Sequence, residues 1–181
     1  MSNGLTLDTR RFWYLLVASV FALHNLEEAI AAPRMLELMQ TSAPAFLRAF
    51  YAGIEVPQLR FSLLIVTALG VITAMIASRR PEAPGSSYTM LVFAALIGLN
   101  ALAHMALTVV FRAYMPGLLT AILLTLPTSA LVLIRGRRES WISSGAFLTV
   151  LPAALVVHGP LLAGFLRASI AVARAFPGGA A

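Results

Sequence analysis

The chain has 181 residues, of which 60% are hydrophobic and only 11% are charged. Soluble domains usually contain about 45–50% apolar and about 25% charged residues. The composition therefore excludes a soluble globular enzyme, a disordered chain and a disulfide-linked secreted domain, and it indicates an integral membrane protein. The absence of cysteine excludes disulfides, iron–sulfur clusters and thiol catalysis, so any metal must bind His, Glu, Asp or Asn.

The charge balance is basic, with 13 basic and 7 acidic residues and a formal net charge of +6. Every basic residue is an arginine, and the arginines stand at the ends of apolar runs rather than along one helix face. This pattern is typical of arginines that set membrane topology. A nucleic-acid partner, which a gathered basic patch would indicate, is not expected.

Five apolar stretches are long enough to cross a hydrocarbon core about 30 Å thick, which takes about 20 helical residues. The predicted spans are residues 12–32, 59–77, 88–111, 115–134 and 141–166. Residues 33–58 mix charged side chains with Met, Leu and Phe, which predicts an amphipathic connector between the first two spans. We therefore expect an all-α fold in which residues 1–181 form a single transmembrane domain.

Five spans place the two termini on opposite sides of the membrane. The short segments on the N-terminal side contain Arg10, Arg11, Arg79, Arg80, Arg135, Arg137 and Arg138. The six other arginines are spread over longer segments, and short loops govern orientation. We predict a cytoplasmic N-terminus and a C-terminus on the outer side.

Polar residues gather inside the predicted spans, where they are costly and usually functional. The first span contains His24-Asn25-Leu26-Glu27-Glu28, and spacings of three and four residues place His24 and both carboxylates on one helix face. The third span contains Asn100 and His104, which are also four residues apart, and the fifth contains His158.

The depth of the three histidines supports a single cluster. At about 1.5 Å per residue, His24, His104 and His158 lie roughly 18, 22 and 25 Å from the cytoplasmic ends of their spans. All three therefore fall in the outer half of the bilayer. A bound divalent metal, a protonated glutamate, His–Glu pairing or a water-filled vestibule would each lower the cost of two carboxylates at this depth.

The segment Tyr114-Met115-Pro116-Gly117 joins the third and fourth spans on the outer side. Pro116 suits the first turn of a helix, and Gly117 allows close approach of the backbone. One interpretation is a tight turn with an interfacial tyrosine. The other places the Tyr114 hydroxyl over the polar cluster as a hydrogen-bond donor.

In combination these residues resemble the HXXEE family of small integral membrane proteins. That family pairs a His-x-x-Glu-Glu motif with a second histidine and a Tyr-x-Pro-Gly motif. The corresponding residues here are His24, Glu27, Glu28, His104, Tyr114, Pro116 and Gly117. The family has no settled activity, so the resemblance indicates positions and not a reaction, and His158 lies outside its pattern.

A metal site is the first hypothesis, with His24, His104 and Glu28 as ligands and His158 as a further ligand. Zinc in such a site would activate water for hydrolysis, and iron would support oxidation. Glu27 is the expected general base or acid, with Asn25, Asn100 and Tyr114 holding the ligands in place. The spacing is not the His-Glu-x-x-His of zinc proteases, so a protease is not predicted.

Two alternatives remain open. The first is metal-free acid–base chemistry on an isoprenoid- or sterol-like lipid, with one glutamate kept protonated. The second is a proton- or ion-coupled transporter, in which Pro127 and Pro152 would break their spans, although a bundle this small would have to act as a homo-oligomer. The favoured hypothesis is a membrane-embedded, zinc- or iron-dependent enzyme acting on a hydrophobic or lipid-like substrate, which is inferred from the depth of the site alone.

Overall fold

The computed structural model describes residues 4–175, without the side chains of residues 4–9, 173 and 174. Within that range all regular secondary structure is helical, which confirms the predicted all-α class. The first half of the chain forms α1 (Gly4–Ile30), α2 (Ala32–Thr41), α3 (Ala45–Tyr51), α4 (Val56–Arg79) and α5 (Pro84–Phe111). The second half forms α6 (Leu118–Thr120), the π-helical η1 (Ala121–Thr125), α7 (Leu126–Arg138), α8 (Ser144–Leu148), α9 (Val150–Val156), the π-helical η2 (Val157–Leu161) and α10 (Leu162–Ala175).

Several of these helical segments are long and apolar enough to cross a membrane. The structure contains four such segments, at Val56–Ser78, Pro84–Phe111, Leu118–Arg138 and Ser144–Val172. A fifth is counted only if α1 and α2, which meet at 70°, are taken together as one broken span. The described helices therefore support four or five spans, in line with the coarse prediction.

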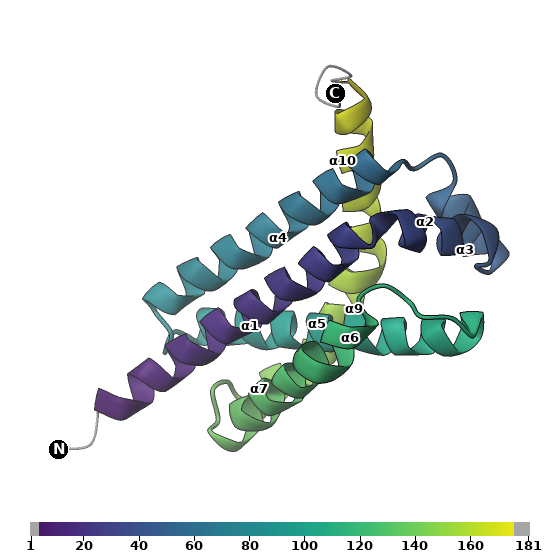
Figure 1. The fold of residues 1–181 in the computed structure, drawn as a ribbon. Coiled ribbons are helices and arrows are strands. Elements are labelled where there is room, and N and C mark those ends of the chain that lie inside the picture. Colours follow the sequence, from purple (N-terminus) through teal and green to yellow (C-terminus); the bar gives the residue numbers. More distant parts are fainter. Residues whose placement is uncertain (1–3, 176–181) are drawn as a thin grey trace.

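The bend between α1 and α2 positions the predicted connector. Pro33 lies in the first turn of α2, where its missing N–H costs no helical hydrogen bond. The chain therefore leaves α1 at Ala31 and runs across one end of the bundle, where α2 and α3 lie beside the start of α4 (Figure 1). The apolar face of α2 is buried there through Met35, Leu36 and Met39. The connector predicted for residues 33–58 is thus largely two short helices.

Two prolines are associated with π-helical turns in the later helices. The wide turn η1 directly precedes Pro127, and Pro160 lies inside η2. Proline cannot donate the usual hydrogen bond to the residue four positions earlier, so a wider turn fits the chain around it. Pro152, in contrast, lies in the first turns of α9, after the break at Thr149. The chain is therefore irregular near both prolines named from the sequence.

Small residues, Ala94 and Gly98, bring α5 and α7 close together. The Ser129 hydroxyl of α7 donates to the carbonyl of Ala94 at 2.7 Å, and it fills the space that a side chain at Gly98 would need. Helix α1 packs along α4 and also contacts η1. These contacts bring α1, α5 and the start of the segment Leu118–Arg138 close together, although the three are distant in sequence.

Candidate metal centre

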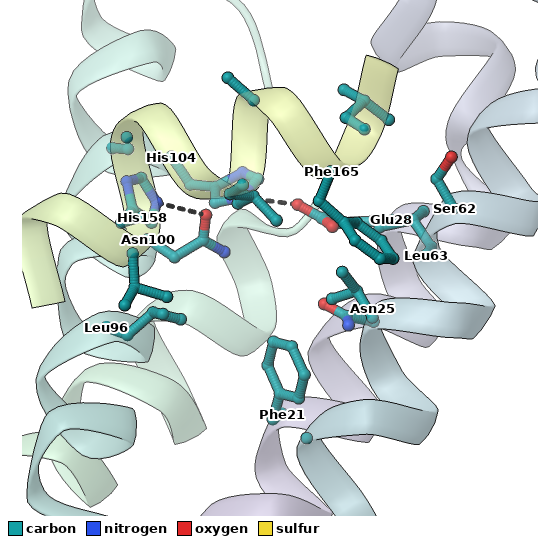
Figure 2. A pocket seen from close by; sticks show the side chains of 18 of the residues that line it. Phe21, Asn25, Glu28, Ser62, Leu63, Leu96, Asn100, His104, His158 and Phe165 are labelled. Carbon is teal, nitrogen blue, oxygen red and sulfur yellow. Dashed lines mark hydrogen bonds and ion pairs between the residues drawn. The ribbon is translucent and has the colours of Figure 1, made fainter. Parts of the chain in front are cut away.

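Three buried side chains meet where α1 crosses α5. His24 and Glu28 lie one turn apart on α1, His104 lies on α5, and their ligand atoms all fall within 4.8 Å of one another. Glu28 Oε1 is 2.7 Å from His104 Nε2 and 3.6 Å from His24 Nε2. Figure 2 shows the Glu28 carboxylate directed at His104. The structure therefore brings together three of the four ligands predicted from the sequence.

The chemistry of this donor set fits a divalent metal. Two imidazole nitrogens and one carboxylate oxygen are ligands that both zinc and ferrous iron accept. Glu28 is only 5% exposed, and a carboxylate is rarely buried to that extent unless it is paired. The Nδ1 atom of His104 is also buried and has no hydrogen-bond partner among the described residues. A bound metal would balance the charge of the buried Glu28 carboxylate, and His104 Nδ1 is a further buried polar atom that a group near the metal would contact.

The hydrogen bonds around His24 determine which of its nitrogens can bind a metal. His24 Nδ1 lies 2.8 Å from the Thr120 hydroxyl, which itself donates to Glu27 Oε2 at 2.6 Å. Because that hydroxyl hydrogen is already committed, His24 Nδ1 must be the donor, and Nε2 presents a lone pair. This tautomer is the one a metal ligand requires, with the ring oriented through its other nitrogen. In this structure Asn100 donates to the same Nε2 at 2.7 Å, so a metal would take the place of this amide on the lone pair.

His158 lies beside the three-residue group and not within it. Its Nε2 is 3.2 Å from Asn100 Oδ1, so Asn100 links the imidazoles of His24 and His158. Figure 2 shows this contact between η2 and α5. The described contacts thus join His158 to the site through an amide, and its predicted role as a further ligand stays a prediction.

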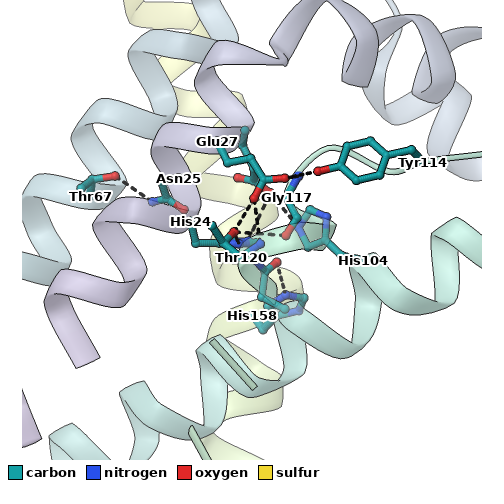
Figure 3. A network of polar contacts seen from close by, with 11 residues as sticks. His24, Asn25, Glu27, Thr67, His104, Tyr114, Gly117, Thr120 and His158 are labelled. Atoms are coloured by element: carbon teal, nitrogen blue, oxygen red, sulfur yellow. Dashed lines mark hydrogen bonds and ion pairs between the residues drawn. The ribbon is translucent and has the colours of Figure 1, made fainter. Parts of the chain in front are cut away.

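Glu27 faces a different set of partners from Glu28. Its carboxylate accepts four hydrogen bonds, from the hydroxyl of Tyr114, the N–H of Gly117 at 3.1 Å, and the N–H and hydroxyl of Thr120 at 2.9 and 2.6 Å (Figure 3). These backbone N–H groups stand at the N-terminus of the helical run that begins at Leu118. They have no partner inside the helix, and the end of the helix dipole favours a negative charge there.

Gly117 fits where no other residue would. Its φ is +90°, a left-handed conformation that glycine adopts without strain. A Cβ atom at this position would lie 2.8 Å from His104 Cε1 and 2.9 Å from His24 Cε1. The backbone of the Tyr-x-Pro-Gly segment therefore packs directly against both imidazoles, and the glycine is required both by conformation and by space.

The Tyr114 hydroxyl lies over the cluster as a donor to Glu27, in agreement with the second interpretation of this segment. Burial and the neighbouring Glu27 carboxylate raise the pKa of the Tyr114 phenol above its usual value, so the phenol keeps its proton and continues to donate. Of the three residues expected to hold the ligands, Asn100 contacts His24 and Tyr114 contacts Glu27. Asn25 instead donates to the Thr67 hydroxyl at 2.7 Å and fixes α1 against α4.

Thr120 is a residue of the candidate site that sequence reasoning missed. It connects His24 to Glu27, three residues after Gly117 and at the start of an apolar span. A threonine in such a place gives a weak signal, because its hydroxyl commonly bonds the backbone of its own helix. The proximity of Thr120 to α1 is the only feature that reveals its role.

A large cavity opens beside the cluster. Its volume is about 970 Å³, near the upper end of the roughly 300–1,000 Å³ typical of small-molecule sites. The polar part of its wall includes Glu28, His104, Asn100 and His158, and most of the remaining wall is apolar (Figure 2). The candidate metal centre therefore faces a space suited to a hydrophobic molecule.

Comparison with known proteins agrees with this arrangement of motifs. The family described as "Protein of unknown function with HXXEE motif" matches residues 15–132, which is more than half of the chain. The chain belongs to the HXXEE family. The family match includes His24, Glu28 and His104, as well as the segment from Tyr114 to Gly117, and it ends before His158.

Among curated proteins, the HXXEE chain is similar to the uncharacterized protein YrkK of Bacillus subtilis (strain 168). The two sequences are 32% identical over 112 residues, which cover 61% of this chain and 66% of YrkK. The match thus spans slightly less than two thirds of that relative. No solved structure matches the chain.

Proposed function

We propose that this HXXEE protein is a metal-dependent enzyme embedded in a membrane, which acts on a hydrophobic molecule bound in the cavity. The observation that carries the proposal is the buried group of His24, Glu28 and His104, whose ligand atoms lie within 4.8 Å of one another. This group opens on an apolar cavity, as a catalytic site for a hydrophobic substrate requires.

Two histidines and one glutamate leave coordination positions for water or substrate. Zinc held in this way would supply an activated water for hydrolysis, and ferrous iron would supply oxygen chemistry. The enzyme is accordingly a hydrolase or an oxidoreductase, and the identity of the metal decides between them.

The contacts of this chain favour separate roles for its remaining polar residues. Glu27 already accepts four hydrogen bonds, so it suits the positioning of His24 through Thr120 better than the transfer of protons. His158 lines the cavity and contacts Asn100. We therefore assign proton transfer at the substrate to His158 and a positioning role to Glu27, in place of the general acid or base predicted from the sequence.

One observation also favours metal-free acid–base catalysis. Glu28 and His104 are 2.7 Å apart and can share a proton without any metal between them. A neutral pair of this kind could donate a proton to a lipid and remove another, as an isomerase or cyclase of isoprenoid- or sterol-like lipids requires.

Elemental analysis of detergent-purified protein without a histidine tag tests the proposal. We expect about one zinc or iron per chain in the wild type and its loss in Glu28→Gln, which keeps the size of the side chain but removes its charge. Glu37→Gln is the matched control, since Glu37 is exposed and pairs with Arg34 on α2. If the wild type stays metal-free after reconstitution with both ions, the metal-dependent proposal is wrong and the acid–base alternative takes its place.

A further inference from the structure

The cavity beside the candidate metal centre is long as well as large. Along α4 its wall extends from Leu59 to Thr73. At 1.5 Å per residue this distance is about 21 Å, which is most of a hydrocarbon core about 30 Å thick. Along α5 the wall extends from Thr89 to Leu107. A molecule that fills the cavity is therefore elongated and parallel to the bundle.

The chemistry of the wall changes along this length. The ligands His104 and Glu28 line the cavity together with Asn100 and His158. The wall from this point toward Thr89 includes Val66, Leu69, Gly70, Val92, Phe93 and Leu96. Since Thr89 precedes Asn100 by eleven residues on one helix, this apolar stretch is about 16 Å long. On the connector side of the polar residues the wall is also apolar, at Met35, Met39, Phe46 and Leu47. The polar part of the occupant therefore lies toward the connector, and its longest apolar part lies against α4 and α5.

Among the described residues that line the cavity, none is an arginine, and the chain has no lysine. The guanidinium of Arg60 donates to the carbonyl of Ala29 at 2.9 Å, and that of Arg167 donates to the carbonyl of Ala49 at 3.2 Å. In the metal-free protein, an anionic head group in the cavity would face the Glu28 carboxylate without an arginine to balance it, and burying an unpaired charge is costly.

The cavity also communicates with the surface of the bundle. Leu69 and Phe46 both line it, and their side chains are 49% and 72% exposed. Leu69 lies on α4, one of the helices apolar enough to cross a membrane. A ligand can therefore enter sideways from the lipid and need not cross the aqueous phase.

We propose that the cavity binds a single long hydrocarbon chain that carries an uncharged, oxygen-bearing head group such as an alcohol, an aldehyde or an ester carbonyl. The head lies beside His104 and Glu28, and the tail lies between α4 and α5. This inference names the substrate class of the proposed enzyme. It rests on the proposed function only for the reaction, because the cavity and its wall do not depend on a metal.

Photolabelling of the metal-free protein in lipid nanodiscs tests the inference. The probe is octadecanol with a photoreactive diazirine on its tail, and the competitors are unlabelled octadecanol and octadecyl phosphate. We expect labelled residues to map to the cavity walls of α4 and α5, and octadecanol to compete at least tenfold better than the phosphate. Equal or better competition by the phosphate would overturn the uncharged head, and labelling confined to the outer surface would overturn the site.

A matched pair of variants locates the tail. Val92→Trp fills the cavity about 18 Å along α5 from His104, whereas Val110→Trp adds the same bulk at an exposed position on the same helix. Labelling should fall at least tenfold in Val92→Trp and stay unchanged in Val110→Trp. Leu96→Trp serves as the second cavity variant if Val92→Trp does not fold. Equal labelling in all folded variants would contradict the assignment.

Metal analysis of the same wild-type protein separates this inference from the proposed function. A wild type that stays metal-free after reconstitution and is still labelled at the cavity walls would support the lipid site while overturning the metal-dependent enzyme. Bound metal without cavity labelling would overturn the lipid site alone. The two claims therefore fail independently.

Discussion

At the scale of single residues, Gly117 and Glu27 join the two motifs of the family. Glu27 of the first motif accepts hydrogen bonds from Tyr114 and Gly117 of the second. Gly117 in turn packs against the imidazoles of His24 and His104. The Tyr-x-Pro-Gly segment thus holds the two imidazoles and Glu27 in place, which gives a physical reason for its occurrence with the His-x-x-Glu-Glu motif.

Gly117→Ala should disrupt both the turn and the site. The left-handed backbone costs alanine about 1–3 kcal/mol, and the added Cβ displaces the two imidazoles. We expect a lower melting temperature and loss of bound metal, measured by thermal unfolding and elemental analysis. Gly164→Ala on α10 is the control, because a Cβ there meets nothing within 4 Å. Normal metal content in Gly117→Ala would show that the close contact is unimportant.

Thr120 permits a sharper test of ligand positioning. Thr120→Val keeps the shape of the side chain but removes the hydroxyl between His24 and Glu27. Loss of such a supporting contact typically weakens metal affinity about 10–100-fold, and Thr120→Ser should restore most of it. Metal titration with a competing chelator measures both variants. Equal affinities for valine and serine would mean that the hydroxyl does not orient His24.

How far the site could be predicted differs from residue to residue. His24 and Glu28 share a helix face by spacing alone, and the depth of His104 brings it to the same level. The partners of Glu27 could not be predicted in this way. They depend on how the turn at Gly117 folds back against α1, and helical periodicity contains no information about that contact.

At the scale of elements, the bend after α1 separates this helix from a connector at one end of the bundle, and α1 counts as a candidate span only together with α2. The mixed composition of residues 33–58 predicts the connector. The angle of 70° and the packing of α2 against its neighbours arise from tertiary contacts, which the sequence pattern does not specify.

The absence of cysteine in the chain makes each introduced thiol a unique label for testing this division. Ser42 in the connector and Leu102 on α5 are both exposed in the structure. In proteoliposomes, Ser42→Cys should react fully with a water-soluble maleimide and Leu102→Cys at least tenfold more slowly, because lipid covers α5. Equal reaction rates, followed by mass spectrometry, would argue against α5 as a span.

At the scale of the whole molecule, the turn between α4 and α5 and the connector lie at opposite ends of the bundle (Figure 1). The arginine-rich short segments predict that the turn is cytoplasmic. In intact cells, an impermeant maleimide should therefore label Ser42→Cys, and it should label Gly85→Cys only after permeabilisation. The reverse pattern would invert the topology and place the site in the inner half of the bilayer.

The X-ray absorption spectrum of the metal-loaded, tag-free protein tests the proposed metal centre most directly. For zinc we predict two imidazole nitrogens at about 2.0–2.1 Å and a carboxylate oxygen at about 2.0–2.2 Å. His104→Ala should remove one of the two imidazoles, and His158→Ala should leave both in place. A spectrum without imidazole, or one that His104→Ala does not change, would contradict a metal centre formed by His24, Glu28 and His104.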